Sequence, residues 1–195
     1  MNKILKTLLF ILFVILTPIS VYAKGEQMSD VLVKQGSEDI LVSSTLTGGF
    51  SKDFEDAIRN GFEKEIIFYI EIYRQWNFWP DEFILSKKIQ RTIRYDGLKK
   101  VYYASSYDGL YLEEKVFDDY ENVKTWVSRI GDVKITQTNL LKPKATYFVR
   151  IKAESKFKRL PPILENLLFF VATTDFKTPW KKSAFFSVKE NHNKK

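Results

Sequence analysis

The sequence predicts a mainly β protein, an antiparallel β-sandwich or curled sheet with two or three short helices. Apolar and polar residues alternate along two neighbouring stretches, 62–76 and 82–96, which is typical of strands with one solvent-facing side. Segments with helical spacing are short and few. The strands therefore do not alternate with long helices, as they would in a parallel α/β fold.

The first elements are predicted from Asp39 onward. The run DILVSSTL, 39–46, is β-like, and SKDFEDAIRN, 51–60, has the spacing of one short amphipathic helix. Ser51 stands where an N-cap belongs, and Gly61 stands where a helix commonly ends.

The next stretches predict an antiparallel hairpin of 62–76 with 82–96. Most even positions of the first stretch and most odd positions of the second are apolar, so even must pair with odd. If paired residue numbers sum to 159, Ile66 faces Ile93, Ile70 faces Ile89, Glu71 faces Lys88 and Glu65 faces Arg94. We predict this register because it joins apolar to apolar and acid to base.

Further β-like runs are predicted at 98–106, 109–117, 144–154 and 183–188. One more helix is predicted over DDYENVKTWVSRI, 118–130. There Tyr120, Val123, Val127 and Ile130 recur at helical spacing.

Residues 1–23 are predicted to form a signal peptide. Lys3 and Lys6 precede an unbroken apolar run, and the small residue Ala23 ends the segment. The alternative is an uncleaved anchor, although the apolar run is short for the roughly 20 residues that span a bilayer. We expect an exported, periplasmic protein, retained on the membrane if the leader is not cleaved.

The rest of the chain is divided into three parts. We predict a flexible linker over 24–38, a single β-rich domain over 39–188 and a charged tail over 189–195. Because there is no Cys and the one His lies in the tail, disulfides, thiol nucleophiles and His-based metal sites are excluded. The net charge of +7 is dispersed, so we predict no nucleic-acid partner and no cofactor.

Gly48 and Gly49 raise the question of a phosphate-binding turn. They precede a helix start, as such a turn requires. However, no Gly-Lys-Ser/Thr follows, and Asp53 and Glu55 in the first helical turn would repel phosphate. The pattern favours a structural strand-to-helix turn and predicts no nucleotide partner.

Two segments are candidate binding surfaces. Trp76, Phe78, Trp79 and Pro80 gather at the tip of the predicted hairpin. They could bind a partner protein, a sugar ring or a membrane interface, or fold back over the sheet as core. Lys156, Lys158 and Arg159 precede an apolar run, which could lie on an anionic membrane or form a buried segment that closes the sandwich.

Two carboxylate pairs, Asp81-Glu82 and Asp118-Asp119, are the remaining candidates for acid/base work or for holding a hard cation. Both stand at predicted element starts, where acids also cap helices or end hairpins.

A resemblance to a known family rests on segments that occur in order between Thr45 and Trp180: AIRNG, EIYRQWNFWPDE, IQRTIRYDGLKKVYYAS, VFDDYENVKTW, LLKPKATYFVRIKAE, LPP and TPW. Together they resemble the bacterial envelope family known as domain of unknown function 4390. The resemblance implies a signal peptide or anchor followed by a single domain, and it implies no catalytic residue.

The functional prediction is an exported, non-enzymatic domain that binds another envelope component, most readily a protein, with an anionic membrane surface as a further partner. The alternative is a periplasmic lipid- or glycan-binding carrier, and a carboxylate-based hydrolase is the third possibility.

Overall fold

A computed structural model describes residues 25–158 and 174–188 of the chain. The strands and helices are β1 (Gln27–Met28), β2 (Leu32–Gln35), β3 (Asp39–Thr47), α2 (Lys52–Arg59), β4 (Lys64–Arg74), β5 (Glu82–Asp96), β6 (Val101–Tyr107), β7 (Leu112–Phe117), α3 (Tyr120–Ser128), β8 (Arg129–Gln137), the 3-10 turn η1 (Thr138–Leu140), β9 (Thr146–Phe157), β10 (Thr174–Lys177), β11 (Lys181–Lys182) and β12 (Phe186–Ser187). Within these residues no helix is long and apolar enough to cross a membrane.

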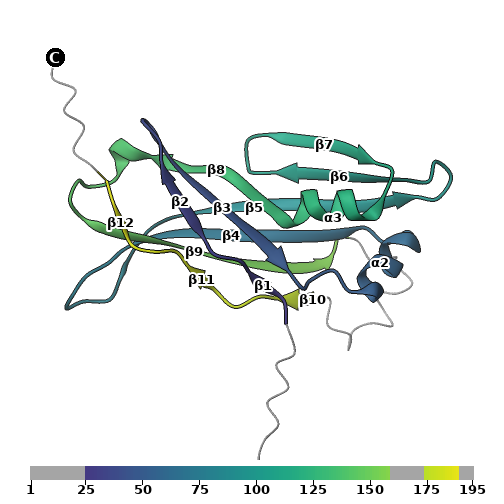
Figure 1. Ribbon diagram of the computed structural model, residues 1–195, viewed down its shortest axis with the longest axis horizontal. Helices are drawn as coiled ribbons and strands as arrows, with labels where there is room; N and C mark the ends of the chain where they lie inside the picture. Colours follow the sequence, from purple (N-terminus) through teal and green to yellow (C-terminus); the bar gives the residue numbers. More distant parts are fainter. Residues whose placement is uncertain (1–24, 159–173, 189–195) are drawn as a thin grey trace, which may run out of the picture.

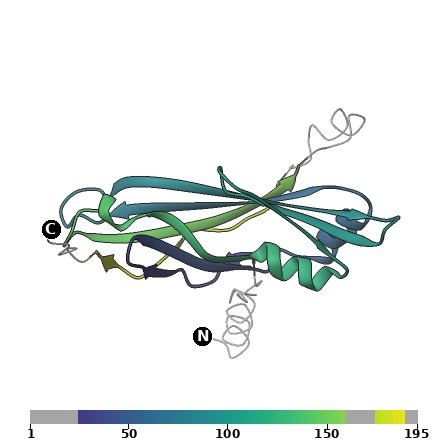
Figure 2. The same ribbon diagram turned by 90° about the horizontal axis from the view of Figure 1, so that it is seen from above.

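The strands form two antiparallel sheets that face each other. The large sheet has the order β10-β9-β4-β5-β6-β7, and β11 and β12 also pair with β9. The small sheet has the order β1-β3-β2, and β8 also pairs with β3. The small sheet lies against one face of the large sheet, called the inner face below (Figure 1, Figure 2). The prediction of a mainly β, antiparallel fold is confirmed.

The inner face of β4 lies at the centre of the hydrophobic core. Ile66, Phe68, Ile70 and Ile72 are fully buried, as the even-position alternation predicted. Their side chains belong to the same core as residues of the small sheet and of both helices. Period-two alternation therefore identified both the strand and its buried side.

The hairpin of β4 with β5 is antiparallel, as predicted, but the predicted register is wrong by two residues. Phe68 faces Ile89, and Ile66 faces Arg91 rather than Ile93. The predicted register paired apolar residues with apolar residues on the inner face, whereas Lys64 and Arg91 are also buried there. Each has compensating contacts: Lys64 pairs with Asp175 at 2.5 Å, and Arg91 donates to backbone carbonyls at the end of α3.

The acid–base pairing expected between β4 and β5 is made instead between β4 and β9. Glu71 lies opposite Arg150, with the two side chains 2.7 Å apart. Glu65 lies opposite Lys156, and their side chains are 3.2 Å apart. The acidic residues of β4 are thus complementary to basic residues of β9, a neighbouring strand that is distant in the sequence.

Both helices begin at the predicted caps. The Ser51 side chain accepts a hydrogen bond from the backbone N–H of Phe54, and Asp119 caps α3 through the N–H of Asn122. Helix α3 ends at Ser128, earlier than predicted, because the chain turns directly into β8. Ile130 therefore packs into the core from a strand.

Part of the predicted flexible linker is instead structured. β1 and β2 lie within 24–38 and pair with β3, and Met28 and Val31 are buried. These strands are too short and polar to show a period, so the sequence pattern missed them. The predicted signal peptide, 1–23, and tail, 189–195, lie outside the described residues.

Candidate functional site

The loop between β4 and β5 carries the predicted cluster of Trp76, Phe78, Trp79 and Pro80, which we call the aromatic tip. Phe78 is 94% exposed, Trp79 77% and Trp76 44%. The alternative in which these rings fold back as core is therefore wrong. The reason is geometric: the loop leaves the ends of the two long strands and bends outward from the end of the large sheet (Figure 1).

The base of the aromatic tip is held by polar contacts. The Arg74 guanidinium stacks on the Trp76 ring at 3.9 Å from its centroid. Glu82 accepts from the Trp76 indole N–H at 3.2 Å and pairs with Arg74 at 3.0 Å. Trp76 is thus fixed, while Phe78 and Trp79 reach into solvent.

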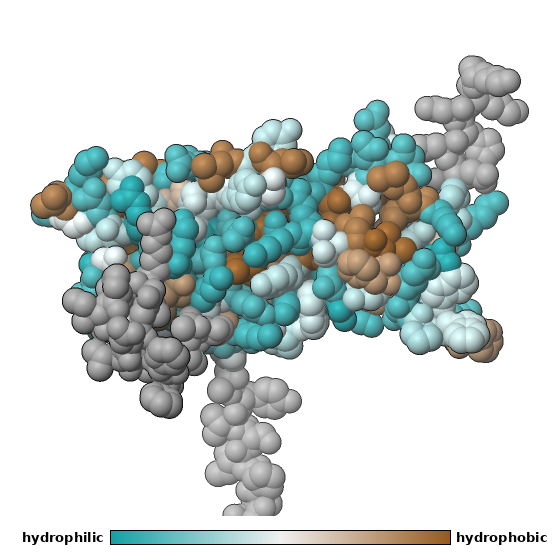
Figure 3. Space-filling view, turned by 180° about the vertical axis from the view of Figure 1, so that it is seen from behind, coloured by the Kyte–Doolittle hydropathy of each residue, from teal (hydrophilic) through white to brown (hydrophobic). Residues whose placement is uncertain are grey.

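A second group of aromatic side chains lies beside the tip, on the outer face of the large sheet. Tyr73 stacks on Phe148 at 5.5 Å and meets Phe83 edge-on at 5.6 Å. Phe148 in turn contacts Phe185 at 5.9 Å, and both Phe83 and Phe185 are exposed. Figure 3 shows a hydrophobic area on this face, toward the end where the tip projects.

Basic side chains surround these rings. Lys182 lies over the ring of Phe148 at 4.3 Å, and Arg150 lies over Tyr73 at 4.5 Å. A surface groove of about 490 Å3 beside Trp76 is lined by Lys142 and Lys144 among other residues. Glu71 neutralises Arg150. The positive charge beside the exposed aromatic surface therefore comes from Lys142 and Lys182, which can attract an acidic group.

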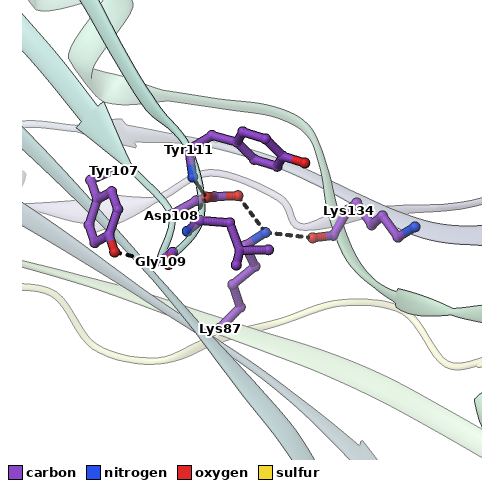
Figure 4. Close-up of polar contacts among 7 residues, drawn as sticks. Lys87, Tyr107, Asp108, Gly109, Tyr111 and Lys134 are labelled. Carbon is purple, nitrogen blue, oxygen red and sulfur yellow. Dashed lines mark hydrogen bonds and ion pairs between the residues drawn. The ribbon is translucent and has the colours of Figure 1, made fainter.

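The turn between β6 and β7 is a separate exposed feature, located further along β5 from the aromatic tip (Figure 4). Lys87 of β5 donates to Asp108 at 2.8 Å and to the backbone carbonyl of Lys134 in β8 at 3.1 Å. Asp108 also accepts from the backbone N–H groups of Leu110 and Tyr111. The Lys87 hydrogen bond, with help from these N–H groups, lowers the pKa of Asp108 to about 2.

This network fixes the turn while leaving its apolar side chains in solvent. Leu110, Tyr111 and Leu112 are all exposed. One lysine thereby connects the large sheet, the small sheet and the turn. This turn was not among the predicted binding surfaces, although the pattern Asp-Gly-Leu-Tyr-Leu, a turn pair followed by apolar residues, indicates an exposed apolar turn.

A comparison with protein-family profiles matches residues 23–184 to "Domain of unknown function (DUF4390)". The chain belongs to the DUF4390 family. The match includes the aromatic tip and confirms the resemblance found in the sequence. Searches of curated proteins and of solved structures found no significant match.

The basic residues expected at a membrane surface are partly paired in this DUF4390 domain. Lys156 pairs with Glu65, and Lys158 pairs with Glu63 at 2.9 Å. Arg159 and the apolar run after it lie outside the described residues. The pairs reduce the charge that Lys156 and Lys158 can offer to an anionic surface.

The Gly48-Gly49 turn has a structural explanation. Gly48 has a φ of 84°, which favours glycine. A Cβ on Gly49 would lie 2.7 Å from the Phe176 ring, so this residue lets the turn pack against β10. Both glycines thus connect β3 to α2, as the sequence pattern favoured.

One member of each candidate carboxylate pair makes a structural contact. Asp119 is the N-cap of α3, and Glu82 holds Arg74 and Trp76. In the described ranges no group of three or more His, Cys, Asp or Glu residues could hold a metal ion.

Proposed function

We propose that this DUF4390 domain is an exported, non-enzymatic envelope protein that acts by binding another envelope protein through the aromatic tip. The exposure of Phe78 and Trp79 carries the proposal. Large aromatic rings are costly to leave in water and are enriched at the centres of protein interfaces. Two such rings on a braced hairpin loop favour a partner that covers them.

The surroundings of the tip support a protein partner. The neighbouring Phe83 and Phe185 extend the apolar surface along the outer face, and Lys142 and Lys182 add positive charge at its border. An apolar centre with a charged rim is the usual composition of a protein interface.

The surface grooves favour this proposal over a lipid carrier. Four grooves on the described residues measure about 370 to 510 Å3, and each is lined partly by basic side chains. A lipid tail in any of these grooves would lie against charged side chains, which is unfavourable for an apolar ligand.

Crosslinking and pull-down from an envelope fraction tests the proposal. The bait is the full chain, compared with Phe78→Ser/Trp79→Ser and with the control Leu98→Ser, which removes another almost fully exposed apolar side chain at a different turn. We expect the double variant to unfold like the wild type but to capture its partner at least tenfold less well. Leu98→Ser should capture it normally.

Equal capture by the double variant and the wild type would refute the tip as the binding surface. Binding of the wild type to vesicles of anionic lipid, lost in the double variant, would replace the protein partner with a membrane. Turnover of a small substrate by the purified chain would replace binding with catalysis.

A further inference from the structure

Among the described residues, half of one edge of β5 has no neighbouring strand. β5 pairs with β4 along its length, from Glu82 to Ile93, but on its other side β6 pairs only with residues from Gln90 to Asp96. The part from Glu82 to Ile89, which we call the open edge, has no strand beside it among the described residues. Figure 1 shows the β6–β7 hairpin covering only one half of β5.

The open edge presents backbone groups that another strand could bind. In an antiparallel ladder, alternate residues direct their N–H and C=O groups to opposite sides. No strand, loop or side chain of the described residues bonds to the groups directed away from β4. Exposed edges of this kind readily pair with another chain.

Natural proteins often protect such edges with lysines, and β5 carries two here. Lys87, however, is turned toward the inner face, where it binds Asp108 and Lys134. Lys88 alone remains in solvent, and it has no ion pair with any described residue. A single lysine on eight residues gives little protection against pairing with another strand. Its positive charge can instead attract an acidic side chain of that strand.

Apolar surfaces stand at both ends of the open edge. The aromatic tip and Phe83 lie at one end, and the β6–β7 turn with Leu110 and Tyr111 lies at the other. The ion pair of Lys87 with Asp108 holds that turn in place (Figure 4). At about 3.3 Å per residue, a strand of eight residues would span the gap of roughly 26 Å between them.

The geometry points to an extended segment of the partner protein as the occupant: we propose that it adds to the large sheet beside Glu82–Ile89, antiparallel or parallel to β5. This inference rests on the proposed function and specifies how the partner binds. Main-chain hydrogen bonds would provide affinity, and side chains on alternate positions would provide specificity. The segment would place an acidic residue near Lys88 and an apolar residue near Phe83.

A single segment fits this edge better than a second copy of the chain. The ends of β2, β3 and β8 project past the open edge on the inner side of the large sheet (Figure 1), and Figure 2 shows them in a separate layer. A symmetry-related copy paired edge to edge would bring its own projecting sheet into the same layer. An isolated strand carries no such obstacle.

Selection from a random eight-residue peptide library displayed on phage, with the full chain as target, tests the proposal. We expect enriched peptides with alternating apolar residues and at least one acid. A matched peptide, N-methylated at alternate residues, keeps its side chains but loses donors on one edge. It should bind at least tenfold more weakly, since several main-chain hydrogen bonds would be lost.

Two variants and a control locate the binding site. Ser86→Lys and Lys88→Glu should each weaken binding of the selected peptide about tenfold or more. Ser86→Lys adds a second lysine that protects the edge, and Lys88→Glu reverses the charge that would attract an acidic residue. Lys52→Glu, an equal charge reversal on α2, should leave binding unchanged. Amide hydrogen exchange should slow within 82–89 when the peptide is bound.

The strand-addition proposal is overturned if no peptide is enriched, if N-methylation has no effect, or if exchange slows elsewhere. A homodimer in solution that Ser86→Lys dissociates would make the second copy the occupant and would also overturn it. The proposed function is judged separately: an envelope partner lost with Phe78→Ser/Trp79→Ser but retained with Ser86→Lys would keep that function and refute strand addition.

Discussion

Removing the carboxylate beside Lys64 should destabilise the protein in a way that depends on pH. Lys64 is 1% exposed and its amino group lies 2.5 Å from Asp175. Asp175→Asn keeps the size of the side chain and its contact with the Ser155 hydroxyl. It leaves the buried ammonium without a negative charge, beside a neutral amide and the rings of Phe157 and Phe54, whose centroids are 3.2 and 5.5 Å away.

The expected loss in unfolding free energy is about 3 kcal/mol at pH 7, the lower end for breaking a buried ion pair. This loss has an upper limit, which we call the ceiling: it cannot exceed the free energy of deprotonating Lys64, because the neutral amine no longer needs a carboxylate partner. From an unfolded pKa of about 10.4, deprotonation at pH 7 costs roughly 4.6 kcal/mol, at about 1.36 kcal/mol for each pH unit.

The ceiling falls as pH rises. Burial already lowers the pKa of Lys64, and losing Asp175 lowers it further. Below the unfolded pKa, the unfolded state then binds more protons than the folded state, so the stability of the variant increases with pH. At pH 9 the ceiling is about 1.9 kcal/mol, and the deficit against wild type should shrink accordingly.

Urea unfolding followed by tryptophan fluorescence at pH 7 and pH 9 measures both effects. The control is Asp30→Asn, which removes an exposed ion pair with Lys181 and should cost well under 1 kcal/mol at either pH. A deficit in Asp175→Asn that equals the control, or that stays constant between the two pH values, would refute the reasoning.

Three further outcomes follow from the packing and the charges. Phe68→Ala, at a fully buried position of β4, should lower the unfolding free energy by about 3–5 kcal/mol in urea titrations; a loss under 1 kcal/mol would contradict the central position of β4. Asp108→Asn should lower stability by about 1–2 kcal/mol near pH 6, after allowing for solvent screening, because its folded pKa of about 2 lies below the unfolded value. That contribution is present above the unfolded pKa and is lost as pH falls through 2, so wild type and variant should converge in acid, and a constant difference down to pH 2 would argue against the ion pair. Gly49→Ala should lower the melting temperature and cost about 1–3 kcal/mol, since its Cβ would force Phe176 to move; an unchanged melting temperature would show that Phe176 can yield.

The sequence predicted the buried face of the central hairpin better than its register. A shift of two residues leaves every side chain on the same face, whereas a shift of one would exchange the faces. The alternation around Phe68 and Ile70 could therefore identify the core side even though the pairing with β5 was wrong. The register itself depended on the buried charges Lys64 and Arg91, whose partners come from distant segments.

Strands without a clear alternation of apolar and polar residues could not be predicted from the sequence. β8 begins directly after α3, and Gly131 and Asp132 interrupt its alternation. Its position is determined by pairing with β3, a tertiary contact that local spacing does not encode.

The residues of the candidate site could be predicted from the sequence, but whether their side chains are buried or exposed could not. Trp76, Phe78 and Trp79 were identified from their clustering, but an aromatic residue serves equally well as core or as contact surface. The open edge had a usable signal in strand length, because the β-like run that forms β5 is longer than the run that forms β6. This difference in length predicts an unpaired edge on β5 only if β5 and β6 are known to be neighbours in the sheet.

The position of β9 has a consequence for how the chain reaches its final form. β4 finds one neighbour, β5, immediately after it in the sequence, but its other neighbour, β9, follows only after three more strands and a helix. Until β9 is in place, β4, whose inner face lies at the centre of the core, has one bare side, and such long-range pairing forms slowly. A chain that stopped before Thr146 would keep that side bare permanently and would be prone to aggregate with its own copies. Correct assembly is thus decided near the end of the chain, long after the central hairpin has formed.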